Sequence, residues 1–468
     1  MTFDVEQYGA TGDGTSDDTT AIQDAITACQ NGGGGVVSFP PGIFLLSGQL
    51  SITAPNVTLA GAGHGATIIR PAANYAPSKI IFINNADFCG VRDLQISYAN
   101  TSSSGNPTAD GIQISQGRYA RIRNVEAFYL GGWFIQSIGS TGKSNLGTII
   151  ENVHALHCAK GIHLQSKQTN WPGQHFLVNI NMEIIDSGDC LFMEDIDDCV
   201  VNGFLGAVNS ASSGSALHIK GAGASDFFFN VDIGAFPGNG GAPTCLIESS
   251  ANGSPSNVII QGGVIQQGAV GLRATAGKQI TISGIKFGGN SGSGADLQDP
   301  VQSLIVENCT FVGNGAIAGA GRYSINVATT NAVFLRGNLF QDNIGSSANH
   351  VNGLVNDVNH VSQVTDNVFS GTGVTPSTAF NSLPAVIRGN KGYNPVGAFT
   401  APAIPSSSIP LTNPFNVDCT VFIAGGTVSA VAIGGTATGL TSGAFSVPAG
   451  QSIAITYSAS PSWVWIGE

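Results

Sequence analysis

Residues 3–26 read FDVEQYGATGDGTSDDTTAIQDAI and open the chain. The Gly- and Asp-rich run predicts a loop, because these residues favour turns over helices and strands. Asp17 or Asp18 then precedes Ile22 and Ile26, whose spacing fits one face of a helix that is capped at its N-terminus. We therefore predict a single convincing helix at about 17–29, ended by the glycines at 32–35 and followed by a strand.

The composition of the whole chain is that of an all-β protein. Among 468 residues there are 64 Gly, and only 10% are charged, so few segments have the residue mixture of helices. The net charge of −12 argues against nucleic acid as a partner, because phosphate binding needs clustered Lys and Arg. No apolar run approaches 18 residues, so we expect no membrane span, and the first residues do not read as a signal peptide.

A polar or Gly residue followed by the start of an apolar strand recurs at intervals of 21–33 residues. The markers are Asp93, Asn124, Asn152, Asn179, Asn202, Asn230, Gly263, Gly284, Asn308, Asn338, Asn367 and Asn390. One turn of a parallel β-helix needs about 20 or more residues, and its loops vary in length. Asn suits the corners because it tolerates left-handed backbone and its amide can stack on the Asn of the next turn. A propeller would need regularly placed hairpins. The period therefore predicts a right-handed parallel β-helix, with the N-terminal helix covering its open end.

The opening stretch, residues 3–26, resembles the start of the pectate-lyase-like β-helix superfamily. That superfamily includes polygalacturonases, pectate-lyase-3-type domains and phage tailspike depolymerases. The motif is specific for the fold, but members differ in their reactions, which include hydrolysis, elimination, epimerisation and fructosyl transfer. The resemblance covers roughly residues 1–395. It implies a carbohydrate polymer or oligosaccharide as partner and an extracellular protein, either secreted or carried on a phage particle.

The character of the sequence changes after residue 395. Residues 396–410 are rich in Pro and Ser and predict a linker. Residues 411–468 contain four or five short apolar strands and predict a small β-sandwich. We therefore expect a β-helix domain at 1–395, the linker, and this C-terminal module. Trp463 and Trp465 in the last strand either belong to the core of the module or form a sugar platform.

Three successive short strands, at 161–167, 188–195 and 215–220, carry the candidate site. Alternation predicts the following outward side chains: His163, Gln165 and Lys167; Asp189, Leu191, Met193 and Asp195; His218 and Lys220. Glu194 falls inward by strict alternation, unless the strand ends at Met193. Apolar outward ladders such as Leu191 and Met193 suggest a homotrimer.

The densest group of acids in the chain lies at 183–198. Hydrolysis of a glycosidic bond needs two carboxyl groups that flank the bond, so we expect the catalytic residues among Asp186, Asp189, Glu194 and Asp195. A solvated loop edge is the simpler interpretation of such a cluster. For substrate binding we expect the basic residues of the neighbouring strands, the loop aromatic and imidazole at 168–175, and one preceding arginine: His163, Lys167, His218, Lys220, Trp171, His175 and Arg118.

The reaction stays open at this point. Asp197-Asp198-Cys199 and His218-Ile-Lys220 are similar in letters to polygalacturonase motifs, but the Asn-Thr-Asp and Gly-His-Gly of that family are missing, so we do not assign its activity. A carboxylate-pair hydrolase needs no cofactor. A lyase would use His163, Lys167 or Lys220, with Ca²⁺ held by the acids. The sequence is also compatible with intramolecular glycosyl or fructosyl transfer, and with a non-catalytic glycan-binding tailspike or adhesin.

The eight cysteines, at 29, 89, 158, 190, 199, 245, 309 and 419, contain no CxxC pair. We expect most of them to be small buried apolar residues, while a few disulfides remain open.

Overall fold

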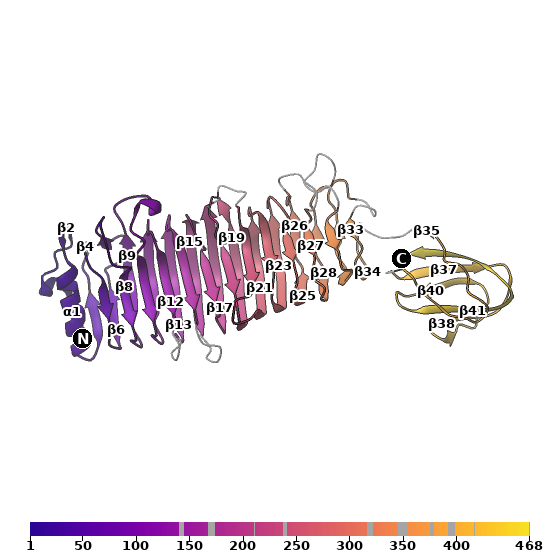
Figure 1. Cartoon of the computed structure of the whole chain (residues 1–468), viewed down its shortest axis with the longest axis horizontal. Coiled ribbons are helices and arrows are strands. Elements are labelled where there is room, and N and C mark those ends of the chain that lie inside the picture. Colours follow the sequence, from indigo (N-terminus) through magenta and orange to yellow (C-terminus); the bar gives the residue numbers. More distant parts are fainter. Residues whose placement is uncertain are drawn as a thin grey trace.

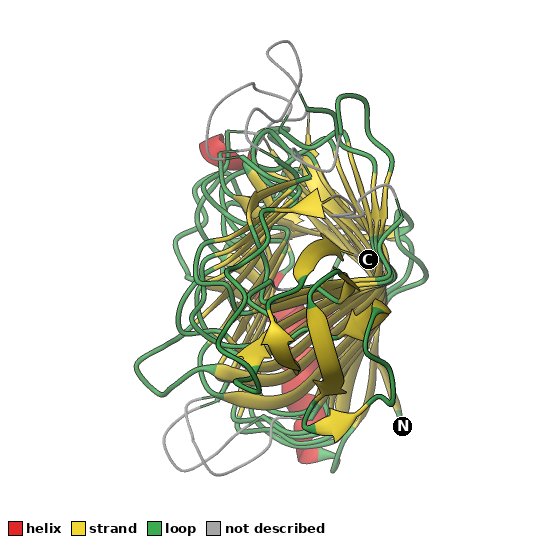
Figure 2. Cartoon of the chain, turned by 90° about the vertical axis from the view of Figure 1, so that its right-hand side faces the viewer, coloured by secondary structure: helices red, strands yellow, loops and turns green. Residues whose placement is uncertain are grey.

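The chain winds into a long parallel β-helix, which confirms the right-handed β-helix that the period predicted (Figure 1). The computed structural model describes residues 1–139, 145–166, 174–209, 211–236, 241–315, 322–344, 353–374, 379–391, 398–415 and 417–467. Viewed along the long axis, the strands of successive turns lie behind one another (Figure 2). Side chains that are two to three dozen residues apart in sequence are therefore direct neighbours across the sheets.

Thirteen strands form one of the two parallel sheets, which we call sheet B. They are β5 (Leu50–Ile52), β8 (Lys79–Asn84), β10 (Asp110–Ser115), β12 (Trp133–Ile138), β14 (Lys160–Gln165), β16 (Leu191–Glu194), β18 (Leu217–Lys220), β20 (Pro243–Glu248), β22 (Val270–Ala274), β24 (Ala295–Leu297), β27 (Ile325–Val327), β30 (Val355–Asp357) and β33 (Phe380–Ser382).

Twenty-one strands form the other parallel sheet, sheet A. They are β1 (Thr2–Asp4), β2 (Asp13–Asp17), β3 (Gly35–Ser38), β4 (Gly42–Leu46), β6 (Val57–Ala60), β7 (Thr67–Pro71), β9 (Gly90–Ser97), β11 (Arg121–Phe128), β13 (Thr148–Leu156), β15 (His175–Ile185), β17 (Cys199–Asn209), β19 (Gly223–Phe236), β21 (Pro255–Gln266), β23 (Lys278–Gly288), β25 (Gln302–Glu307), β26 (Thr310–Val312), β28 (Val333–Arg336), β29 (Leu339–Phe340), β31 (Ser362–Thr365), β32 (Val368–Phe369) and β34 (Val386–Arg388).

The predicted cap helix is present as α1 (Thr19–Asn31), and two short 3-10 helices lie at η1 (Val5–Tyr8) and η2 (Ser103–Gly105). Helix α1 buries Ile22, Ala25, Ile26 and Cys29 against the first turns at the N-terminal end of the solenoid (Figure 1). The Asp17 carboxylate accepts the backbone N–H of Thr19, and so it satisfies one of the free donors of the first helical turn.

The predicted corner ladder is present within sheet A. Asp93, Asn124, Asn152 and Asn179 all have φ between 52° and 58°, a left-handed conformation that Asn and Asp tolerate better than other non-Gly residues. The Nδ2 of each Asn donates to the side-chain oxygen one turn earlier, at 2.8, 3.2 and 3.0 Å. The ladder fixes the bend of each long strand, and further along the chain Gly203, Gly262 and Gly284 occupy left-handed positions.

The interior is a continuous apolar core of inward side chains. Near the C-terminal end of the solenoid, Phe287, Phe311, Phe340 and Phe369 stack with ring centroids 4.8–4.9 Å apart. All eight cysteines are buried thiols, as predicted for small apolar residues. Within the described residues, no helix is long and apolar enough to cross a membrane.

The C-terminal residues form two antiparallel four-stranded sheets at the end opposite α1 (Figure 1). One contains β35 (Ala398–Phe399), β37 (Cys419–Ala424), β40 (Gly443–Val447) and β42 (Ser462–Gly467); the other contains β36 (Leu411–Thr412), β38 (Thr427–Ile433), β39 (Thr436–Ala437) and β41 (Ser452–Ala459). This is the small β-sandwich that the sequence predicted.

The residues predicted as a linker pack against this sandwich. Strand β35 pairs with β42, and Pro402 accepts a hydrogen bond from the Trp463 indole, so part of the 396–410 segment is joined to the module. Trp465 is fully buried and Trp463 nearly so, which places both in the core of the sandwich and not on a sugar-binding surface.

Candidate active site on sheet B

The strands of sheet B enter the sheet with two consecutive buried residues and alternate only afterwards. In the second predicted strand these two residues are Cys190 and Leu191, and Met193 is also buried. Phe192 and Glu194 therefore face outward. The prediction that Leu191 and Met193 point outward was wrong, because it ignored this shift at the corner. The apolar surface from which a trimer was inferred is part of the core.

A row of stacked rings crosses the outer face of the sheet. His163, Phe192 and His218 occupy matching positions on β14, β16 and β18. Trp133 on β12 is the register partner of Lys160, and its ring packs against that of His163. The ring centroids of this row follow one another at 5.0, 4.7 and 4.6 Å. Lys160 Nζ lies 5.4 Å from the Trp133 ring centre. Stacked rings form a flat, partly apolar surface, which suits the faces of sugar rings.

His218 is held between two carboxylates. Its Nδ1 lies 3.2 Å from Asp189 Oδ2, and its Nε2 lies 3.3 Å from Glu248 Oε1. Glu248 is also 3.5 Å from Lys220 Nζ. The site thus contains an imidazole, an amine and two acids in direct contact.

Glu194 lies on the other side of Lys220 in the register of the sheet. Its carboxylate accepts a hydrogen bond from Gln165 Nε2 and lies 3.6 Å from His163 Nε2. The interaction with His163, followed by the charge of Lys220 and the Gln165 hydrogen bond, outweighs burial and lowers the pKa of Glu194. Glu194 is therefore ionised at neutral pH and suits a base or a charge partner better than a general acid.

The other two predicted catalytic acids lie at corners of the coil and not on the face of sheet B. Asp186 follows β15, accepts a hydrogen bond from Ser103 Oγ at 2.6 Å and lies 3.2 Å from His157 Nδ1. Asp195 follows β16 with φ 54°. Its carboxylate accepts the Ala222 N–H at 3.0 Å and the Ser250 hydroxyl at 2.7 Å, on the next two turns. Asp195 thus fastens neighbouring turns, and the four acids do not form one cluster.

Of the predicted binding residues, His163, His218 and Lys220 lie on the site, and two others do not. His175 points into the solenoid and is 1% exposed, and burial lowers its pKa to about 4. Arg118 lies in the turn that precedes β11 of sheet A, and its guanidinium group lies 2.6 Å from Asp87 Oδ2. The structure thus places His175 and Arg118 away from the outward face of sheet B, where both were expected to bind substrate. Lys167 and Trp171 lie outside the described residues.

Sequence reasoning missed Phe192 and Glu248. Phe192 was missed because the predicted alternation of its strand was shifted by one residue, which placed its side chain inward. Glu248 ends the strand Pro243–Glu248 and follows the same alternation as Lys220, its neighbour in the register. Glu248 could have been predicted by applying the alternation of the Lys220 strand to the strand one turn later. Two strand spacings separate Glu194 from Glu248, or about 9.5 Å between their backbones.

The polar face continues toward the C-terminal turns. Arg273, Asp296, Arg322 and Asn326 line a pocket of about 320 Å³ there, and Arg273 Nε donates to Asp296 Oδ2 at 3.0 Å. Within the described part of the chain, no group of three or more His, Cys, Asp or Glu is arranged to hold a metal ion. Calcium therefore remains an expectation tied to the lyase hypothesis.

Known proteins share the fold and part of the sequence. Residues 2–183 match the family model described as rhamnogalacturonase A/epimerase, pectate lyase-like. The mannuronan C5-epimerase AlgE6 of Azotobacter vinelandii is 36% identical over 151 residues, which are 28% of this chain and 17% of the epimerase. Alginate lyase 7 of the same organism is 43% identical over 76 residues, which are 15% of this chain and 9% of the lyase. The chain thus spans only a small part of the length of these relatives.

Two solved structures cover most of the chain. The A-module of AlgE6 from Azotobacter vinelandii aligns with a TM-score of 0.51 and 18% identity, over 84% of this chain and 98% of the module. The Dettilon tailspike protein aligns with a TM-score of 0.53 and 15% identity, over 100% of this chain and 94% of the tailspike. The coils and their open polar sheet thus define a solenoid of the parallel β-helix class. Residues 2–183 are thus similar to the pectate-lyase-like family, in agreement with the resemblance of the opening stretch.

Proposed function

We propose that this protein is an extracellular enzyme that modifies a uronate-containing polysaccharide on sheet B. The proposed reaction begins with removal of the proton next to the sugar carboxylate, as C5-epimerisation or elimination requires. The observation that carries the proposal is the contact group of His218, Lys220, Glu248 and Asp189 beside a row of stacked rings. The epimerase and lyase named among the relatives support the substrate class.

Each group has a role in this proposal. Lys220 binds the sugar carboxylate and neutralises the charge that develops when the proton leaves. His218 accepts the C5 proton at Nε2, and Asp189 holds its Nδ1. In elimination the electron pair left at C5 then expels the C4 oxygen, and in epimerisation a proton returns to C5 from the other face of the ring. The rings of Trp133 and Phe192 support the sugar units. The proposed site lies within one chain.

Hydrolysis by a carboxylate pair is the second candidate. Glu194 and Glu248 favour it, because they are two carboxylates on the same face that flank Lys220 in the register, two strand spacings apart. Against it stands the lowered pKa of Glu194, since a hydrolase needs one carboxyl group that stays protonated. For this reason we place proton abstraction first.

Incubation with a panel of polyuronates in deuterium oxide tests the proposal. Epimerisation introduces deuterium at C5, which proton NMR detects, and elimination produces an unsaturated sugar that absorbs in the ultraviolet. New reducing ends without deuterium or unsaturation would instead establish a hydrolase. Binding without any product would identify a glycan-binding tailspike or adhesin and refute enzyme activity.

A further inference from the structure

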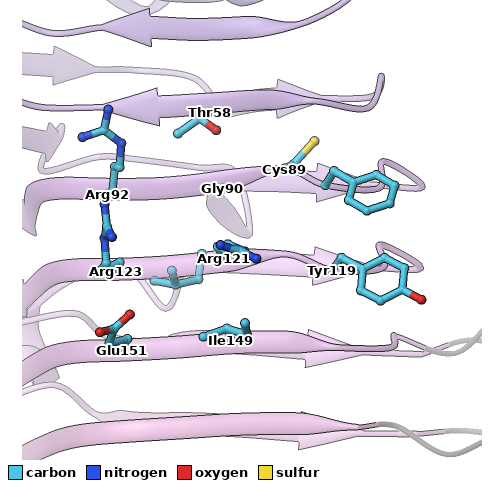
Figure 3. A pocket seen from close by; sticks show the side chains of 11 residues that line it. Thr58, Cys89, Gly90, Arg92, Tyr119, Arg121, Arg123, Ile149 and Glu151 are labelled. Atoms are coloured by element: carbon cyan, nitrogen blue, oxygen red, sulfur yellow. The ribbon is translucent and has the colours of Figure 1, made fainter.

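A second hollow lies on sheet A, away from the candidate active site. It has a volume of about 470 Å³ and is lined by residues of β6, β9, β11 and β13 and of the turns before them (Figure 3). Thr58, Gly90, Arg121 and Ile149 are neighbours in the register. Gly90 has no side chain, and a Cβ there would lie 2.8 Å from the backbone oxygen of Arg121. The hollow thus exists because glycine stands between two longer side chains.

The lining is rich in arginine. Arg92, Arg121 and Arg123 all line this one pocket, in a chain with only 17 Lys and Arg and a net charge of −12. Figure 3 shows Arg92 and Arg123 at one end of the pocket and Arg121 between them and Tyr119 at the other end. Such a local concentration of positive charge attracts anions in spite of the overall negative charge.

The arginines differ in how far they are already neutralised. Arg92 is paired with Asp93. Arg121 and Arg123 are exposed, and neither forms an ion pair with any residue that the structure describes. Glu151 is the carboxylate among the described lining residues. Arg121 therefore presents a guanidinium group whose planar donors fit a carboxylate.

Two exposed aromatic rings stand beside these arginines. Phe88 and Tyr119 stack with centroids 5.0 Å apart and planes 14° apart. They are 56% and 43% exposed, so they are not part of the core. A ring surface next to a guanidinium group suits a ligand that has both an apolar ring face and a negative charge.

We propose that this pocket binds a carboxylated sugar unit of an acidic polysaccharide, as a site separate from the one on sheet B. Arg121 and Arg123 bind the carboxylate, and Tyr119 packs against the sugar ring. The choice of a polysaccharide rests on the proposed function, whereas the preference for an anion rests on the arginines alone. The site would hold a polymer without acting on it chemically.

Calorimetric titration of the full chain with tetragalacturonate tests this site. Arg121→Gln and Tyr119→Ala are each expected to weaken binding at the pocket tenfold or more. Arg388→Gln is the matched control, because Arg388 is also exposed and lies on β34 of the same sheet. Its affinity is expected to equal that of the unaltered chain. Equal melting temperatures establish that the variants are folded.

Two results would overturn the proposal: unchanged affinity in Arg121→Gln, or sulfate competing as well as the oligouronate at equal charge. A neutral tetrasaccharide is expected not to bind at this pocket. Turnover of polyuronates is measured in parallel. Binding that Arg121→Gln abolishes, with no turnover by the unaltered chain, refutes the proposed function and supports the pocket. Turnover by the unaltered chain, together with equal affinity for the oligouronate in the unaltered chain and in Arg121→Gln, supports the proposed function and refutes the pocket.

Discussion

At the scale of the residue, His218 is the group most directly tied to the proposed chemistry. His218→Gln keeps a polar side chain but cannot transfer a proton, so turnover is expected to fall about a hundredfold or more. The melting temperature is expected to change little, because the side chain lies on the outer face. Steady-state kinetics with a polyuronate measure the effect. Retention of most of the turnover would remove His218 from the mechanism.

For Asp195 we expect the opposite of His218, namely a loss of stability without a loss of turnover. Its carboxylate joins its own corner to the next two turns, so Asp195→Asn is expected to lower stability by about 1–3 kcal/mol through weaker hydrogen bonds. Asn tolerates the left-handed backbone, so the substitution tests the charge alone. Turnover per folded molecule is expected to stay the same. A large loss of turnover without a lower melting temperature would restore Asp195 as a catalytic candidate.

Asp226 on β19 gives a prediction about pH. It is 2% exposed and accepts the Cys199 N–H at 3.2 Å, and burial raises its pKa from 3.8 to about 8. The unfolded chain therefore loses this proton at a lower pH than the folded chain does. The contribution of the protonated form to stability is complete below about pH 4 and is lost as the pH rises to about 8.

Asp226→Asn carries no charge at any pH and keeps the acceptor oxygen. Its advantage in melting temperature over the unaltered chain is expected to grow between pH 5 and pH 8. Asp232→Asn, at an exposed position of the same strand, is the control and is expected to show no such trend. Parallel melting curves at both pH values for all three proteins would contradict the raised pKa.

At the scale of the element, a matched pair of substitutions tests how much the corner ladder contributes to stability. Asn152 donates to Asn124, accepts from Asn179 and has φ 52°. Asn152→Gly removes the two amide hydrogen bonds but accepts the backbone conformation, whereas Asn152→Ala also adds about 1 kcal/mol of strain. Thermal unfolding is expected to rank the unaltered chain above Gly and Gly above Ala. Three equal melting temperatures would show that the ladder adds no stability.

The ladder and β16 show what could be predicted from the sequence and what could not. The corner Asn residues were found because one backbone conformation recurs once per turn and few residues tolerate it. The phase of β16 was missed because two adjacent residues, Cys190 and Leu191, are both buried where the chain enters the sheet, and simple alternation contains no such step. The pairing of His218 with Glu248 depends on register across turns, which loops of unequal length conceal in the sequence.

At the scale of the whole molecule, sheet B is long enough to contact several sugar units at once. Arg273 lies two strands beyond His218 in the same row, or about 9.5 Å away. Arg273→Ala is expected to raise KM several-fold for long polyuronates and to leave KM for the shortest substrates unchanged, because only long chains reach it. The dependence of KM on chain length measures this. An equal rise for all lengths would place Arg273 next to the reacting sugar.

The buried thiols also matter for the design of experiments. Burial raises the pKa of Cys158 and Cys245 to about 12, and all eight cysteines are enclosed. A maleimide dye added to the native protein should therefore find no target, so a single cysteine introduced on the surface would be the sole attachment point. Fluorophores placed in this way along the solenoid would report where a glycan chain docks and in which direction it runs.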